Sequence, residues 1–240
     1  MIEVFTANTP NGIKVPIALE ELGVPYELRI IALGSPDLRS VEYLAINPNA
    51  KIPAIRHLNG SDGPVTVFES GAILLYLADK FGKFLPASGP ERTEALNWLF
   101  WLQGAAPYLG GGFGHFYAYA PEKYEYPINR FAMEVKRQLH LLDTRLGETR
   151  YLGGDTYTIA DIVTWPWYGN LVLGEAYGAA EFLQVQEYQN VMRWAKEIAA
   201  RPAVKRGRIV NRISGPLEEQ LHERHDASDF ELRTQDKIGG

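Results

Sequence analysis

The sequence of 240 residues contains no cysteine. Without a thiol of its own, the chain cannot form disulfides, use a cysteine nucleophile or bind a metal through thiolate. Histidine is scarce as well, with five in total, and only His222 and His225 lie close together. Both belong to a polar segment, so a solvated tail explains them without a metal. We expect no metal site, and any thiol chemistry needs a thiol that a ligand supplies.

Long apolar runs and clusters of basic residues are also missing. No stretch reaches the roughly 20 apolar residues that span a bilayer, and residues 1–5 lack the basic flank and apolar stretch of a secretion signal. We therefore expect a cytoplasmic protein with neither a membrane nor a nucleic acid as partner. Four of the five net negative charges lie in residues 214–240, which carry seven acidic and three basic side chains. This segment is expected to be a polar acidic tail.

The first 82 residues alternate β-type runs with helical patterns. The expected strands are 2–5, 26–31, 54–57 and 65–68, with one helix after residue 9 and another over 70–81. Strands joined through a helix favour parallel pairing, whereas the tight connection between the last two strands favours an antiparallel hairpin. The expected fold is an α/β domain over 1–82 with a mixed four-stranded sheet.

The remainder of the chain reads as helical. Residues 83–90 contain glycine, proline and serine, which suit a linker, and 91–213 form the expected all-α bundle. Apolar residues recur every three or four positions from Ile128 to Leu146, which predicts one long amphipathic helix. Thr158 and Asp161 have the spacing of a capping box before another apolar run.

Three segments at strand ends are candidates for chemistry. The first is Thr9-Pro10-Asn11-Gly12, between a strand and a helix. Its hydroxyl and amide side chains suit a simple helix cap. The same geometry can instead stabilise an anion, including a thiolate, through amide groups and the helix dipole.

The second candidate segment is Ile52–Pro53, at the entrance of a strand. A proline there can serve only to set the chain direction. Alternatively, a cis bond before Pro53 turns the backbone of Ile52 outwards, where a peptide-like ligand can pair with it as a short antiparallel strand.

The third candidate segment is Glu69–Ser70, where a strand meets a helix. Ser70 is a good N-cap by itself. A helix start beside an acid also suits an α-amino acid, whose carboxylate binds the amides and hydroxyl while Glu69 binds the ammonium. Together the three segments imply a thiol-containing peptide with a free amino-acid end.

Residues 9–12, 51–55 and 68–77 resemble the thioredoxin-like domain of the glutathione S-transferase superfamily, and the capping box resembles its helical-domain motif. Within the superfamily, segments 9–12, 98–101 and 162–167 are similar to the Nu class and its fungal nitrogen-regulator-like relatives. The resemblance implies catalytic roles for Thr9 and Asn11 at the glutathione sulfur. It implies that Ile52 pairs with the cysteinyl backbone and that Glu69 and Ser70 hold the γ-glutamyl end. The implied glutathione-binding residues are Lys51, Ile52, Pro53, Glu69, Ser70, Arg130 and Arg39.

One departure from the Nu-class pattern concerns the loop after the second strand. That class uses a glutamine there, whereas this loop reads Gly-Ser-Pro-Asp-Leu-Arg over 34–39. We expect Arg39 or Lys51 to hold the glycyl carboxylate in its place. Aromatic residues of the helical domain are candidates for a second-substrate pocket, although such residues are more often core: Phe113, Phe116, Tyr119 and Trp167.

The activity expected from this resemblance is glutathione-dependent reduction of a small disulfide, with the glutathione thiolate as nucleophile. Two alternatives stay open, which are conjugation of glutathione to electrophiles and a non-catalytic glutathione-binding regulatory protein. Glutathione is expected as substrate, bound as two molecules per site or as its disulfide. The resemblance also implies a homodimer, for which Phe84 and the helix around Trp101 offer apolar surface.

Overall fold

The computed structural model describes residues 1–60 and 63–211. The expected acidic tail over 214–240, including His222 and His225, lies outside the described residues. By its contacts the described chain separates into two compact units, Met1–Lys83 with residues 200–211, and Phe84–Ala199. The expected helical domain over 91–213 differs from this division at its end, because α9 (Pro202–Gly207) packs against α1 (Pro10–Leu22).

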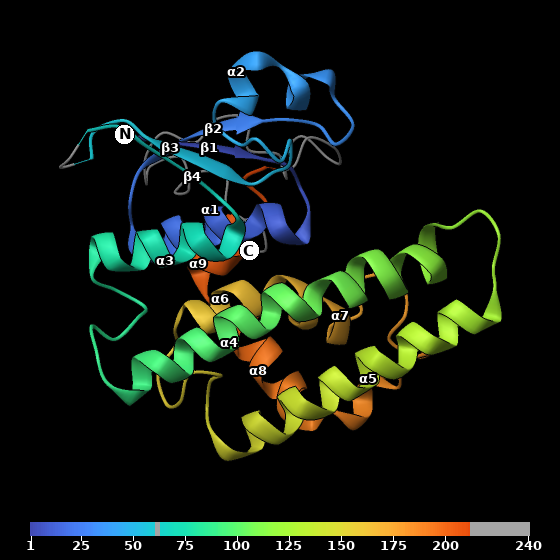
Figure 1. The fold of residues 1–240 in the computed structure, drawn as a ribbon. Helices are drawn as coiled ribbons and strands as arrows, with labels where there is room; N and C mark the ends of the chain where they lie inside the picture. The colour runs from blue at the N-terminus through green and yellow to red at the C-terminus, as the bar shows by residue number, and fades with distance from the viewer. Residues whose placement is uncertain (61–62, 212–240) are drawn as a thin grey trace, which may run out of the picture. The chain divides into compact units, whose positions relative to one another are not determined.

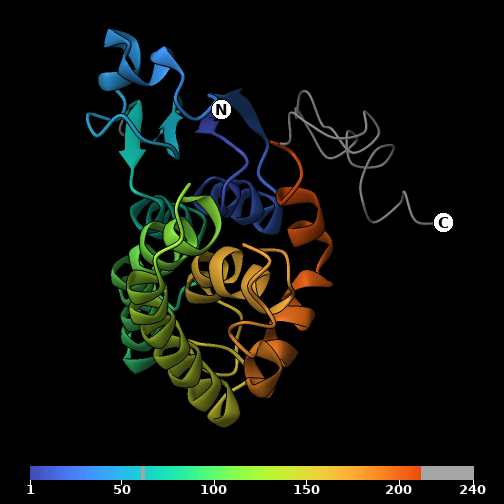
Figure 2. The same ribbon diagram turned by 90° about the vertical axis from the view of Figure 1, so that its right-hand side faces the viewer.

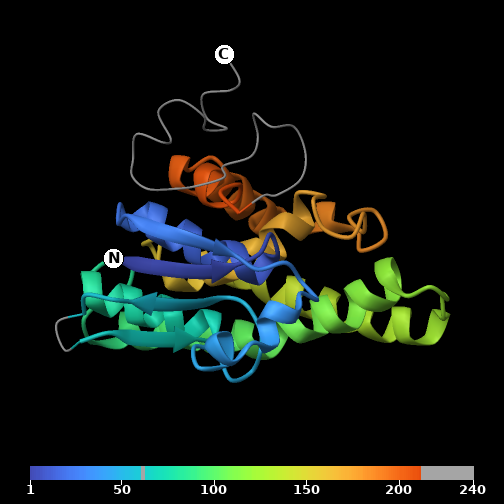
Figure 3. The same ribbon diagram turned by 90° about the horizontal axis from the view of Figure 1, so that it is seen from above.

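The first unit is a mixed four-stranded sheet with helices on its two faces (Figure 1). Its strands are β1 (Ile2–Thr6), β2 (Tyr26–Ile30), β3 (Ala54–His57) and β4 (Val65–Phe68), in the order β2-β1-β3-β4. The pair β1–β2 is parallel, and the pairs β1–β3 and β3–β4 are antiparallel, an arrangement that can be followed from above in Figure 3. The predicted α/β fold with a mixed sheet is confirmed.

Helices lie on both sides of this sheet, and α1 and α3 each bury an apolar face. On one side, α1 lies beside α3 (Ser70–Phe81), and both contact the strands. On the other side lie η1 (Pro36–Arg39) and α2 (Val41–Leu44). The helix α1 ends at Gly23, which adopts the left-handed conformation (φ 69°) that glycine takes without strain.

The second unit is helical, as Figure 2 shows. Its elements are α4 (Pro90–Pro107), η2 (Tyr108–Tyr119), α5 (Glu125–Glu148), α6 (Ile159–Thr164), η3 (Trp165–Gly169), α7 (Asn170–Val172), η4 (Val185–Glu187) and α8 (Gln189–Ala199). The predicted amphipathic helix corresponds to α5, which buries Val135, Leu139 and Leu142. Within the described ranges, no helix is both long and apolar enough to cross a membrane.

The predicted capping box at α6 is confirmed and is fully buried. Thr158 Oγ1 accepts from Ala160 N–H at 3.3 Å, while Asp161 accepts from Thr158 N–H at 3.0 Å. The same carboxylate also accepts from Leu152 N–H at 3.0 Å and from the indole N–H of Trp194 at 2.9 Å. One acid therefore joins the helix start to two other segments of this unit.

Candidate active site

The sheet register brings the three candidate segments to one edge. Phe5 near the end of β1 pairs with Ala54, the first residue of β3, and Ala54 pairs with Phe68, the last residue of β4. Because neighbouring strands lie about 4.8 Å apart, these ends span about 10 Å. The segments that continue from them, beginning at Thr9, Ile52 and Glu69, are therefore neighbours in this unit.

The start of α1 is organised around Thr9. This residue is the N-cap, and its Oγ1 accepts from Gly12 N–H at 3.0 Å. Gly12 approaches the preceding loop so closely that a Cβ here would lie 1.9 Å from the carbonyl oxygen of Ala7. The first turn contains no acidic residue. Its amides and the helix dipole are therefore suited to an anion from outside the helix.

Beneath this helix start lies a residue that the sequence interpretation missed. Lys14 is only 1% exposed, and its ammonium donates to Asn11 Oδ1 at 2.8 Å and to Ser70 Oγ at 3.2 Å. Burial lowers the pKa of Lys14 to about 7, although the negative charge of Glu69 acts in the opposite direction. The position of Lys14 three residues after Asn11 places both on one helix face, a signal that could have revealed the pair.

The second candidate segment contains the predicted cis peptide bond, between Ile52 and Pro53. Its backbone is held from behind by α2 and the residues after it, because Tyr43 Oη and Asn47 Nδ2 donate to the carbonyl of Lys51 at 2.7 and 2.6 Å. Among the described residues, no backbone hydrogen bond reaches Ile52. Its amide and carbonyl are therefore suited to pairing with a peptide-like ligand.

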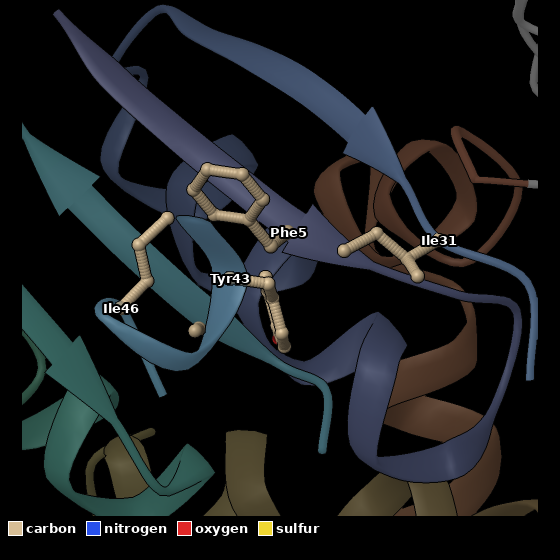
Figure 4. Close-up of a cluster of buried hydrophobic side chains, with 5 residues drawn as sticks. Phe5, Ile31, Tyr43 and Ile46 are labelled. Atoms are coloured by element: carbon tan, nitrogen blue, oxygen red, sulfur yellow. The ribbon is translucent and has the colours of Figure 1, made fainter. Parts of the chain in front are cut away.

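A small cluster of buried hydrophobic side chains, drawn in Figure 4, lies against Ile52 of this segment. Phe5 packs edge-on against Tyr43, with ring centroids 5.7 Å apart. Ile31, Ile46 and Ala54 complete the cluster, and Ile52 packs against it. Burial raises the pKa of Tyr43 to about 12, so this residue stays protonated and can donate to the carbonyl of Lys51.

The third candidate segment differs from the prediction in one respect. The N-cap of α3 is Glu69, and Ser70 is the first residue of the helix, so the expectation that Ser70 acts as N-cap is wrong. The buried hydroxyl of Ser70 instead accepts from Lys14. Glu69 is exposed and has φ 69° and ψ 117°. A non-glycine residue with positive φ costs about 1–3 kcal/mol, and such residues concentrate at ligand clamps.

A second residue missed in the sequence is Asn211, which follows α9. Its Nδ2 donates to the carbonyl of Ala7 at 2.8 Å and to Thr6 Oγ1 at 3.2 Å, and Thr6 Oγ1 donates to the carbonyl of Gly12 at 2.9 Å. These bonds secure the loop that leads into Thr9. Asn211 is about 200 residues away in sequence, so no local pattern could have indicated the contact.

The other predicted glutathione-binding residues are on the surface. Arg39 ends η1 and Lys51 precedes the cis bond, and both are exposed in the first unit. Arg130 is exposed on α5 in the second unit. The structure therefore groups Asn11 and Ser70 around Lys14, with Thr9 as the N-cap of the same helix. Arg130 belongs to the second unit.

The predicted pocket residues of the second unit have different environments. Phe113 is fully buried and stacks on Tyr117 and Phe182, which favours the core interpretation. Phe116 stacks on Phe131, with centroids 5.7 Å apart. Tyr119 is 72% exposed, and half-buried Trp167 lies against Gly110, where a Cβ would be 2.5 Å from the indole ring. Phe116, Tyr119 and Trp167 have partly accessible rings that a substrate can contact.

Within the described ranges, no group of three or more histidine, aspartate or glutamate side chains is placed to hold a metal ion.

Comparison with known proteins gives consistent matches over both units. The N-terminal domain of glutathione S-transferases matches residues 9–80, and the C-terminal domain of the same family matches residues 125–197. The disulfide-bond oxidoreductase YghU of Escherichia coli strain K12 is 59% identical over 245 residues, covering 100% of this chain and 85% of YghU.

Two solved structures have similar folds. The glutathione transferase YghU from Streptococcus pneumoniae, complexed with glutathione, has a TM-score of 0.84 and 54% identity, with 90% of this chain and 84% of that chain covered. A glutathione transferase from Burkholderia graminis, with two glutathione molecules bound per subunit, has a TM-score of 0.83 and 41% identity, with 89% of each chain covered.

Proposed function

This chain belongs to the glutathione S-transferase family, and on that premise we propose that it reduces small disulfides with glutathione. The observation that carries the proposal is a helix start suited to an anion in a chain without cysteine. Both reacting thiols then come from glutathione. The similarity to YghU, named as a disulfide-bond oxidoreductase, supports this activity above the alternatives.

The proposed reaction proceeds in two exchange steps. The thiolate of one glutathione attacks a sulfur of the substrate disulfide, so that a mixed disulfide forms and the other half of the substrate leaves as a thiolate. The thiolate of a second glutathione then attacks the glutathione sulfur of the mixed disulfide. Glutathione disulfide forms, the second half of the substrate leaves as a thiolate, and solvent protonates both leaving groups. The substrate gains two electrons, which two glutathione molecules lose.

The proposed binding roles follow the order of the three segments. Thr9, Asn11 and the start of α1 lower the thiol pKa of glutathione by stabilising its thiolate. The Ile52–Pro53 segment pairs with the cysteinyl backbone, and Glu69 with Ser70 holds the γ-glutamyl end. The span of about 10 Å between the strand ends suits an extended tripeptide.

Other parts of the proposal rest on the family resemblance. Arg130, with Arg39 or Lys51, is proposed to bind the carboxylates of glutathione, and Phe116, Tyr119 and Trp167 to contact the second substrate. The segments 98–101 and 162–167 support membership of the Nu class. A homodimer is proposed as well, and Phe100, which is 62% exposed, supports an apolar interface. Phe84 is less suited to that role, since its ring contacts Tyr157 of its own chain.

Turnover of bis(2-hydroxyethyl) disulfide with glutathione tests the proposed activity. We expect formation of glutathione disulfide well above the uncatalysed rate, and a loss of about tenfold to a hundredfold in Asn11→Ala, because one donor to the thiolate is removed. Asn129→Ala, an exposed change on α5, serves as the matched control and should keep full turnover.

One result would exclude the proposed activity, and two others would each support one of the alternatives. A rate no higher than that of free glutathione at equal thiolate concentration excludes disulfide reduction. Turnover of an aryl halide together with one glutathione per subunit in soaked crystals supports conjugation. Glutathione binding without either turnover supports a regulatory protein.

A further inference from the structure

The most unusual side chain of the first unit is the buried ammonium of Lys14. Lysine is almost never fully buried without a charged partner, because water solvates its charge better than protein does. Here the direct partners are two neutral groups, Asn11 Oδ1 and Ser70 Oγ. In the described part of the chain, Glu69 is the charged group that acts on Lys14, and no carboxylate forms a salt bridge with it.

The chemistry of an ammonium group determines how its two partners are oriented. An ammonium can only donate, so both partners must turn an acceptor towards it. The amide of Asn11 therefore turns its oxygen to Lys14 and its NH2 donors to the opposite side. The hydroxyl of Ser70 accepts from Lys14, so its own hydrogen points away from the lysine. Lys14 thus sets the direction of the donors at both positions.

We propose, building on the proposed glutathione-binding function, that Lys14 is a positioning residue for two anionic groups of glutathione, its thiolate and its γ-glutamyl carboxylate. Through Asn11 it presents amide donors to the thiolate, and through Ser70 it presents a hydroxyl donor to the γ-glutamyl carboxylate. The lysine connects α1 with α3, which are 56 residues apart at this contact. One buried charge thereby couples the recognition of the thiolate to the recognition of the γ-glutamyl carboxylate.

A purely structural role does not account for a charge at this position. An apolar side chain of similar size would fill the same volume without the cost of removing an ammonium from water. The lowered pKa of Lys14 expresses that cost. Anions bound next to Asn11 and Ser70 would favour the protonated amine and recover part of the cost. The energetic benefit of the lysine therefore appears when the ligand is bound.

The test compares the unaltered chain with Lys14→Met, which keeps the length of the side chain and removes its charge. The primary measurement is the pKa of the thiol of bound glutathione, followed by the ultraviolet absorbance of the thiolate. In the unaltered protein we expect the thiol pKa of bound glutathione to lie below the ordinary thiol value of about 8.5. In Lys14→Met we expect it to rise by about one unit, with a rise of about tenfold in the KM for glutathione.

S-methylglutathione separates the two contributions, because it keeps the γ-glutamyl carboxylate but cannot form a thiolate. Its affinity should fall in Lys14→Met through the Ser70 contact alone, and by a smaller factor than that of glutathione. The matched control is Lys136→Met, at a partly exposed lysine that donates to Gln184 at the surface of the second unit. This control should leave both affinities and the thiol pKa unchanged.

Two results would overturn the inference. One leaves the proposed glutathione-dependent function intact, and the other excludes that function as well. An unchanged thiol pKa and KM in folded Lys14→Met exclude a positioning role while leaving the proposed function intact. An unaltered protein that neither binds glutathione nor lowers its thiol pKa excludes the proposed function together with this inference. If Lys14→Met does not fold, Lys14→Leu, which also lacks a hydrogen-bond donor, is tested in the same assay, and an unaltered thiol pKa there excludes the role equally.

Discussion

The starts of α1 and α6 use the same cap and differ in the charge placed beside it. Thr9 and Thr158 are both extended N-caps whose hydroxyl accepts a backbone amide of the first turn. The third helical residue is Gly12 in α1 and Asp161 in α6. The buried charged residue near the start of α1 is Lys14, whereas near the start of α6 it is Asp161.

This difference separates a helix start that serves stability from one that serves binding. At α6 the carboxylate of the chain itself satisfies the local donors, so the start is closed to other anions. At α1 the first turn supplies no acid, and a buried cation adds to the positive end of the helix. Changes at α6 should therefore affect stability, and changes at α1 should mainly affect ligand chemistry.

The largest effect on stability is expected from Asp161→Ala. The change leaves Leu152 N–H, Thr158 N–H and the indole N–H of Trp194 without their buried acceptor. We expect the free energy of unfolding to fall by about 3–5 kcal/mol, which urea denaturation measures. Asp155→Ala, an exposed change in the preceding loop, should remain within about 0.5 kcal/mol of the unaltered chain. Similar losses in both variants would show that the buried carboxylate of Asp161 does not stabilise the start of α6.

The second-largest effect on stability comes from the buried Lys14 of α1 and depends on pH. The pKa of Lys14 is about 7 in the folded chain and 10.5 for an ordinary lysine. Between these values the unfolded chain binds more protons, so the contribution of this residue to stability rises with pH. From pH 7 to pH 9 we expect a rise of about 2 kcal/mol in the unaltered chain that Lys14→Met lacks.

Urea denaturation of the ligand-free proteins at pH 7, 8 and 9 provides this measurement. Lys14→Met should be the more stable protein at pH 7, and the difference should narrow towards pH 9. Lys136→Met should follow the unaltered chain over the whole range, because Lys136 is partly exposed and its bond to Gln184 lies at the surface. If the free energies of unfolding of Lys14→Met and the unaltered chain differ by the same amount from pH 7 to pH 9, burial does not lower the pKa of Lys14 as expected.

Much of the fold was predictable because its signals are local. The strands β3 and β4 and the helix α3 have the predicted bounds, since turn residues and apolar periodicity mark them directly. The capping box at Thr158 was recognisable from two residues at a fixed spacing. The mixed sheet followed from the order of elements and the lengths of their connections.

The candidate site was predictable only in part, because its supporting contacts are distant in sequence. The three segments at the strand ends could be identified, and so could the cis bond before Pro53. The contacts of Lys14 with Ser70 and of Asn211 with Ala7 depend on how α3 and the end of the chain pack on α1. Ser70 was misassigned as a cap for the same reason, since its hydroxyl contacts the lysine of another helix.

The smallest expected effect on stability comes from the two N-cap threonines. It gives the most direct comparison, because the same substitution is made at both helix starts. Thr9→Ala and Thr158→Ala each remove a cap and should each cost about 1 kcal/mol of unfolding free energy. Only Thr9→Ala should also lower disulfide turnover, by about tenfold per folded molecule, because only Thr9 lies at the proposed thiolate site. Thr9→Ser, which keeps the hydroxyl, should retain most of that turnover. Parallel denaturation and turnover assays decide the matter: an equal loss of turnover in both alanine variants would show that Thr9 acts through stability, as Thr158 does.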